Sequence, residues 1–261
     1  MSKIIKTIIF VFLCIAVISS DTPAENRQPR DLNQIIKSGK LIIAMVDMEL
    51  PPFITGSGGE GLEGTEVDMA RDIAVRLDVS LEIIRADYFD DVVDLVAAGK
   101  ADIGLSNLSM SCDRARHVKF SIPYRTLQIT LLLNRVKLAS MRLPDGLIKP
   151  EQFKNTPGPI GVVEKSAYEA ASRKYFPKAV FKTYKGYKEI LRDVEKGNLF
   201  IAVGNSGTIN DYLKKEPQLM VRLQPFNVED FVDHIAIAVG LENDHLLSWL
   251  NTYLTVKGIN R

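Results

Sequence analysis

The sequence predicts an α/β protein built from two similar lobes, and three observations support this prediction. Short apolar runs alternate with stretches of helical spacing, which is typical of a parallel sheet with helices on both faces. The alternation stops at a connection that contains proline and glycine, residues 144–159, and then resumes. Finally, GKADIGLSN at 99–107 and GNLFIAVGN at 197–205 share their glycine, central isoleucine and final asparagine. We therefore expect one helix–strand–polar loop unit of the same kind in each lobe.

Composition sets the broad class of the protein. With 261 residues, 46% of them hydrophobic and 25% charged, the chain is long enough for one large domain or two lobes. A net charge of +1, without basic runs that carry aromatic residues, gives no reason to expect a nucleic-acid partner. The three histidines are widely separated in the sequence, so we expect no metal site, and we expect no cofactor.

Residues 1–24 are predicted to be a signal peptide. Two lysines precede an apolar stretch at 7–18 that is short for a membrane span, and small residues follow it between 19 and 24. An uncleaved N-terminal anchor is the alternative. After cleavage Cys112 would be the only cysteine, so the exported protein would contain no internal disulfide.

The first lobe is expected over residues 25–126. A capping box, Thr65 to Asp68, is predicted to open a helix that runs to residue 77 with apolar residues at helical spacing. The other elements expected here are helices at 31–38 and 88–98 and strands at 41–47, 81–85 and 101–105. Gly99 supplies the expected end of the second of these helices.

The second lobe is expected over residues 127–235, after a long apolar strand at 124–134 that leads into it. Ser166 and Glu169 form a second predicted capping box, and Asn205 is predicted to cap another helix. The elements expected are strands at 160–163, 180–184 and 199–203 and helices at 166–175, 187–196 and 206–213. A strand at 233–239 and a helix at 243–254 then follow, so we assign residues 236–261 to the first lobe.

The polar loop at 106–111 is the strongest candidate for a binding site. It follows a buried strand and precedes a short predicted helix at 112–117, with Ser111 as its N-cap and Arg114 in its first turns. Backbone N–H groups and a guanidinium at a helix N-terminus favour a carboxylate ligand. The alternative is a solvated loop with an ordinary surface arginine. No histidine is positioned to activate Cys112, so we expect this thiol to be inert.

The segment SNLSMSCDRARHVKFSIPY, residues 106–124, resembles the ligand-binding segment of the bacterial extracellular solute-binding proteins of family 3. These are the polar amino-acid receptors of ABC transporters, and the resemblance covers nearly all of the chain after residue 38. It implies a two-lobed type II periplasmic-binding fold, each lobe a mostly parallel sheet flanked by helices, with two crossover strands as a hinge. It also implies a monomer in the periplasm that binds an amino acid or related small carboxylate and delivers it to an ABC-transporter membrane permease.

The resemblance assigns roles to particular residues. Arg114 would hold the ligand carboxylate, with Ser109 and the loop amides after Asn107 assisting. Ser166 would contribute from the second lobe. The ligand side chain would be lined by Asp47, Glu49 and Phe89.

Two positions depart from the family pattern. Asn205 stands where the family places an aspartate that pairs with the α-ammonium, and Leu50 replaces an aromatic residue that stacks on the ligand. A desolvated cation without a countercharge costs several kcal/mol. Either Asp47 or Glu49 therefore supplies the charge, or the ligand is not a plain α-amino acid.

Two other functions are compatible with the same fold. One is a cyclohexadienyl dehydratase-like enzyme that acts on prephenate or arogenate, with Glu49 or Glu164 as the acid. The other is a ligand-sensing periplasmic protein. The main prediction is a binding protein without catalytic residues.

Overall fold

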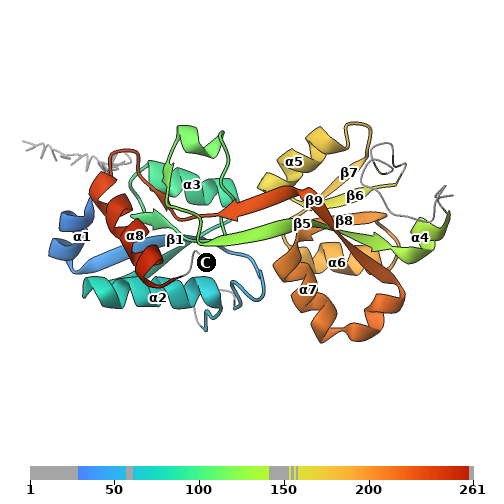
Figure 1. The fold of residues 1–261 in the computed structure, drawn as a ribbon, viewed down its shortest axis with the longest axis horizontal. Coiled ribbons are helices and arrows are strands. Elements are labelled where there is room, and N and C mark those ends of the chain that lie inside the picture. Colours follow the sequence, from blue (N-terminus) through green and yellow to red (C-terminus); the bar gives the residue numbers. More distant parts are fainter. Residues whose placement is uncertain (1–28, 57–60, 141–152, 154–155, 157, 259–261) are drawn as a thin grey trace, which may run out of the picture.

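The computed structural model describes residues 29–56, 61–140, 153, 156 and 158–258, without the side chains of 229–231. It contains two lobes joined by two long strands, as Figure 1 shows. One lobe has a sheet of order β2-β1-β3-β10-β4, and the other has a sheet of order β7-β6-β8-β5-β9. The predicted two-lobed α/β architecture is confirmed.

The first lobe is built on parallel pairing of β1 with β2 and β3. Strand β10 lies between β3 and β4 and is antiparallel to both. Gly39 follows α1 directly and Gly99 follows α3 after its C-cap Ala98, and both have φ of 66°, as expected at helix ends. The elements are α1 Leu32–Ser38, β1 Lys40–Val46, α2 Thr65–Leu77, β2 Ser80–Ala86, α3 Phe89–Ala97, β3 Ile103–Gly104, a 3₁₀ turn Arg114–Arg116, β4 Lys119–Phe120, β10 Ala238–Val239 and α8 Asp244–Val256.

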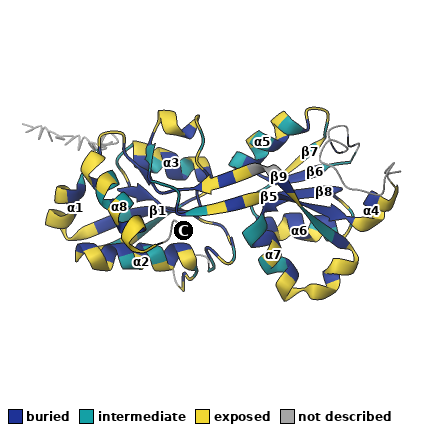
Figure 2. Ribbon diagram, viewed as in Figure 1, coloured by how far each residue is buried: buried dark blue, intermediate teal, exposed yellow. Residues whose placement is uncertain are grey.

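The second lobe pairs β6 parallel with β7 and β8, and β5 runs antiparallel between β8 and β9. Its elements are β5 Arg125–Asn134, α4 Arg135–Ser140, β6 Ile160–Val163, α5 Ala167–Tyr175, β7 Phe181–Tyr184, α6 Tyr187–Glu195, β8 Ile201–Asn205, α7 Ser206–Lys215, a 3₁₀ helix Pro217–Val221 and β9 Leu223–Ile235. Figure 2 shows the central strands β1, β6 and β8 in the buried colour and much of the outer helical surface as exposed. Buried apolar residues thus line both sheets and form one contiguous cluster.

Strands β5 and β9 form the connection between the lobes. They pair from Arg125 opposite Ile235, at the first lobe, to Asn134 opposite Leu223, with a register shift between Gln128 and Thr130. The division that we predict at 126/127 and 235/236 lies at the first-lobe end of this pair, and it stays a prediction.

Three sequence predictions are wrong in detail. The strand expected at 233–239 is two strands, and the long β9 begins ten residues earlier, at Leu223. Charged residues and Pro225 interrupt its apolar pattern, which hid it. The helix expected at 112–117 is only a 3₁₀ turn over Arg114–Arg116, although Ser111 Oγ does accept from the Arg114 N–H at 3.2 Å.

The third correction concerns the start of α2. Gly64, not Thr65, is the N-cap, and Thr65 is the first helical residue. The predicted capping box does not form, because the Thr65 N–H donates to the Pro52 carbonyl oxygen at 3.3 Å and the Asp68 N–H to the Gly64 carbonyl oxygen at 2.9 Å, while Thr65 Oγ1 accepts from Arg125. The short elements α4 and β4 had no sequence signal strong enough to predict.

Several predictions fall outside the described residues. The signal peptide at 1–24 does, and so does most of the connection at 144–159. Among the helices in the described part, none has the length and apolar character needed to cross a membrane.

Gly64 gives a direct test of the α2 start. It has φ of +111°, and a Cβ there would lie 2.3 Å from the Phe53 carbonyl oxygen, whereas Gly61, at φ +71°, has open space. We expect Gly64→Ala to lower the free energy of unfolding by roughly 3 kcal/mol or more, from left-handed strain plus overpacking. Gly61→Ala should lower the free energy of unfolding by roughly 1–2 kcal/mol, because it adds the backbone strain without the overpacking. Equal losses in urea unfolding would contradict this account.

Candidate functional site

A completely buried carboxylate, Glu66, fixes the loop that follows β3. Its Oε2 accepts from the Asn107 N–H at 2.8 Å and from the Tyr124 hydroxyl at 2.6 Å. Its Oε1 accepts from Arg125 Nη1 at 2.7 Å. Burial, together with the charge of Glu66, raises the pKa of Tyr124 well above its ordinary value, so its hydroxyl remains a donor. The charge of Glu66 is thus compensated by one cation and two further donors.

Arg125 ties this buried carboxylate to the binding loop. It donates to Asn107 Oδ1 at 2.9 Å, and its guanidinium lies over the Phe53 ring, 4.4 Å from the centroid. Asn107 has φ of +47°, a left-handed conformation that asparagine tolerates better than most residues. The loop therefore turns sharply after β3 and directs residues 109–114 toward the second lobe.

Arg114 lies in the cleft with only 8% of its side chain exposed. Nη1 donates to the Ser109 carbonyl oxygen at 2.9 Å, and Nε and Nη2 donate to Asp90 Oδ1 at 3.0 and 2.9 Å. These contacts use three of the five N–H groups of the guanidinium. Among the described contacts, one N–H on Nη1 and one on Nη2 have no acceptor, so two donors remain for an anion.

Asp233, on β9, is the second buried charge in the cleft. Its Oδ2 accepts from Ser109 Oγ at 2.9 Å and from the Tyr168 hydroxyl. Burial raises the pKa of Asp233, although these two hydrogen bonds and the charge of Arg114 act in the opposite direction. A loop of the first lobe, helix α5 of the second and a connecting strand meet at this carboxylate.

Two helix N-termini of the second lobe face the same region. Ser166 caps α5 by accepting from the Glu169 N–H at 3.1 Å, and Asn205 caps α7 by accepting from the Thr208 N–H at 2.8 Å. Both N-cap predictions are confirmed, but only half of the predicted Ser166–Glu169 capping box forms, because Glu169 Oε2 accepts from the Lys165 N–H at 2.8 Å. The lobes also touch directly here, because Lys165 Nζ lies 4.1 Å from the centre of the Tyr88 ring.

Two cavities lie between the lobes, and both are lined by Ser109, Arg114, Ser166, Ala167 and Tyr168. The smaller has a volume of about 10 Å³ and the larger of about 420 Å³. The smaller is lined in addition by Leu50, Phe89, Asn107, Tyr187 and Asn205. Asp90, Asp113, Lys174 and Asp233 are the charged residues added in the larger one.

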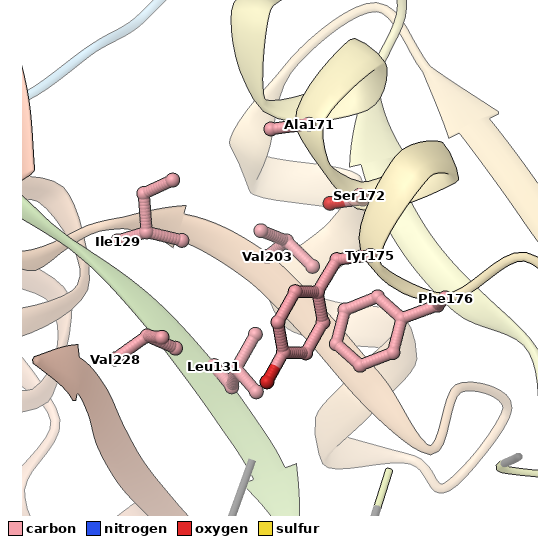
Figure 3. Close-up of a pocket in the computed structure, with 8 residues that line it drawn as sticks. All are labelled: Ile129, Leu131, Ala171, Ser172, Tyr175, Phe176, Val203 and Val228. Carbon is pink, nitrogen blue, oxygen red and sulfur yellow. The ribbon is translucent and has the colours of Figure 1, made fainter. Parts of the chain in front are cut away.

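A third cavity, shown in Figure 3, lies in the second lobe against α5. It has a volume of about 20 Å³ and no charged residue lines it. Ile129 and Ala171 separate it from the larger cleft cavity, since they line both. Its lining therefore offers no charged group that would bind a carboxylate.

The structure brings together six of the eight residues assigned by resemblance. They are Asn107, Ser109, Arg114, Phe89, Ser166 and Asn205. Asp47 and Glu49 instead form contacts outside the described cleft cavities. Asp47 pairs with Arg85 at 2.9 Å, and Glu49 accepts from the Gly56 N–H at 3.0 Å. Neither lines a described cleft cavity, and the ligand roles of all eight stay predictions.

Sequence reasoning missed Tyr168, Tyr187 and Asp233. Tyr168 and Tyr187 fit the apolar spacing of α5 and α6, so the sequence explains them as core residues and gives no sign that they line the cleft. Asp233 lies in FVDHI, within a stretch that we predict to be a strand, where a buried polar group signals a specific contact. The position of Asp233 could thus be noticed in the sequence, but the sequence does not show which residues Asp233 contacts.

Comparison with known proteins gives one family. The model of the bacterial extracellular solute-binding proteins, family 3, matches residues 42–255. ABC transporter arginine-binding protein 1 of Escherichia coli (strain K12) is 21% identical over 80% of this chain and 82% of that protein. An amino-acid ABC transporter substrate-binding protein of Streptococcus pneumoniae, solved with L-arginine, superposes with a TM-score of 0.73 at 21% identity, covering 87% of this chain and 92% of that one. The type II periplasmic-binding fold is confirmed.

Some relatives are enzymes, among them a cyclohexadienyl dehydratase and membrane-bound lytic murein transglycosylases. Cyclohexadienyl dehydratase of Pseudomonas aeruginosa is 29% identical over 124 residues, which is 48% of this chain and 45% of that protein. The match covers less than half of either chain. Glu164, which we considered as an acid for such an activity, lines neither described cleft cavity, and nor does Glu49.

Glu66→Gln tests whether the buried pair supports the site. The variant removes the charge opposite Arg125 and leaves this partly buried cation without its partner, so we expect it to lose about 3 kcal/mol of unfolding free energy. Glu82→Gln is the matched control, because Glu82 pairs with Lys40 at 2.8 Å on the surface. This control should lose at most about 1 kcal/mol. Similar losses for the two variants in chemical unfolding would show that the Glu66 pair is not a structural requirement.

Proposed function

Because the chain belongs to the bacterial extracellular solute-binding proteins of family 3, we propose that it binds an amino acid or a similar small carboxylic acid between its lobes. The observation that supports this proposal is the buried Arg114, which keeps two N–H donors for an anion. An arginine held this way matches the two oxygens of a carboxylate.

The second lobe supports the same chemistry. Helix α5 begins at the cleft, and Ala167 and Tyr168 of its first turn line both cavities. The Ser166 hydroxyl donates to the Val163 carbonyl oxygen at 2.6 Å, so it is the helix N–H groups that face an anion here. A carboxylate held between Arg114 and α5 would link the two lobes.

The wider role that we propose is uptake. A protein of this family with a cleaved signal peptide would work outside the cytoplasmic membrane, in the periplasm, and would present its bound solute to an ABC-transporter permease. An arginine-binding protein among its relatives supports the proposal that the solute is an amino acid. A dehydratase-like activity is the alternative, and turnover of prephenate or arogenate by the purified protein would contradict a purely binding role.

Arg114→Ala is the variant that tests the carboxylate site. Thermal unfolding is measured with and without each common amino acid, keto acid and dicarboxylate, because a ligand that binds only the folded state raises the melting temperature. Hydrogen bonds to charged groups contribute about 1.5–3 kcal/mol, so the variant should bind roughly 10- to 150-fold more weakly. Each variant is compared with its own unliganded form, since Arg114 also bonds Asp90 and Ser109.

The matched control is Arg116→Ala, which removes an exposed arginine from the same 3₁₀ turn. It should keep the response of the wild-type protein. Binding as tight in Arg114→Ala as in the wild type would show that the carboxylate site is elsewhere. The absence of a response to any acid would contradict the proposed function itself.

A further inference from the structure

We propose that Asp233, and not Asn205, holds the ammonium group of the ligand. The ligand is then an amino acid that lies in the larger cleft cavity, with its carboxylate on Arg114 and its nitrogen against strand β9. This inference rests on the proposed function and adds the position and the charge of the second recognition group.

The position of Asn205 is unsuitable for a cation. Its side chain carries no charge, only 1% of the residue is exposed, and its Oδ1 is engaged by the Thr208 N–H. Tyr187 fills the space beside it, in contact with Asn205 and so close to Gly204 that a Cβ there would lie 2.7 Å from the ring. The cavity left at this point, about 10 Å³, holds at most one water molecule.

Asp233 has what Asn205 lacks. Only 8% of the residue is exposed, and no lysine or arginine of the described residues forms an ion pair with it. Both described hydrogen bonds go to Oδ2, and no described donor reaches Oδ1. A buried carboxylate without a direct ion pair is costly, even with the charge of Arg114 nearby, so an incoming ammonium would gain both a partner and a free acceptor.

Ser109 sets Asp233 and Arg114 beside one another. Its carbonyl oxygen accepts from Arg114 Nη1, while its hydroxyl donates to Asp233 Oδ2. A cation site and an anion site are therefore separated by a single residue on the wall of one cavity. The two charged groups of an α-amino acid are separated by one carbon and fit such an arrangement. The cavity volume, about 420 Å³, is within the range of small-molecule sites.

The other charged residues of this cavity are poorer candidates. Asp90 is already bonded to Arg114, and 55% of its side chain is exposed. Asp113 and Lys174 are exposed, so solvent and salt screen them. Among the described residues that line the cavity, Asp233 is thus the buried acidic group that lacks a cationic partner.

The test uses Asp233→Asn, which keeps the shape and the acceptor for Ser109 and Tyr168 but removes the charge. Affinities are measured by calorimetry for each common L-amino acid that binds the wild type, and for the α-hydroxy acid with the same side chain, such as L-alanine with L-lactate. We expect the wild type to prefer the amino acid, and the variant to bind it at least about tenfold more weakly, because a charge-assisted bond is lost. Binding of the hydroxy acid should stay within about threefold or improve.

Asp244→Asn is the charge-matched control, since Asp244 lies at the exposed start of α8 and pairs with Lys119. It should leave both affinities unchanged. An unchanged amino-acid preference in Asp233→Asn overturns this inference but leaves the proposed function intact. If neither class of acid binds the wild type, both are wrong.

Asn205→Asp gives an independent answer should Asp233→Asn fail to fold. If the ammonium lay beside Asn205, the new carboxylate would tighten amino-acid binding by about fivefold. Our inference predicts no gain in affinity, and a gain would overturn it.

Discussion

The ion pair between Glu66 and Arg125 is the interaction on which the rest of the cleft depends. A completely buried carboxylate must have a countercharge, and here the countercharge is the first residue of β5. The same pair holds both the backbone and the side chain of Asn107. Helix α2, the binding loop and one connecting strand are therefore fixed by one buried charge, and the positions of Ser109 and Arg114 follow from it.

The binding loop is also attached to the second connecting strand. Ser109 forms a bridge with Ile235, and the Met110 N–H donates to the His234 carbonyl oxygen at 2.8 Å. Asp233 extends this attachment through Ser109 to Tyr168 of the second lobe. A solute that binds Arg114 and Asp233 would contact the loop and the strand that joins the lobes at the same time. Solute recognition and the relative position of the lobes would thus share the same side chains.

Most of the fold was predictable because its signals are local. Helical spacing, glycine helix ends and the caps Ser166 and Asn205 depend on residues within one turn of each other. The errors arise where distant residues decide. The box at Thr65 fails because the Thr65 N–H donates to the Pro52 carbonyl oxygen and its hydroxyl accepts from Arg125, and β9 pairs with β5 over a stretch that has little apolar pattern of its own. Asp233 meets Ser109 across 124 residues of sequence, which no local pattern can show. Asp47 and Glu49 came only from resemblance, and the structure turns them to other partners.

The central claim, that one amino acid binds both charged groups of the cleft, is tested most directly by a crystal structure of the protein grown with the amino acid that stabilises it most. The account predicts density between the lobes, with the ligand carboxylate within hydrogen-bonding distance of Arg114 and its nitrogen within that distance of Asp233. A ligand nitrogen bonded to Asn205, or a ligand outside the cleft, would contradict it.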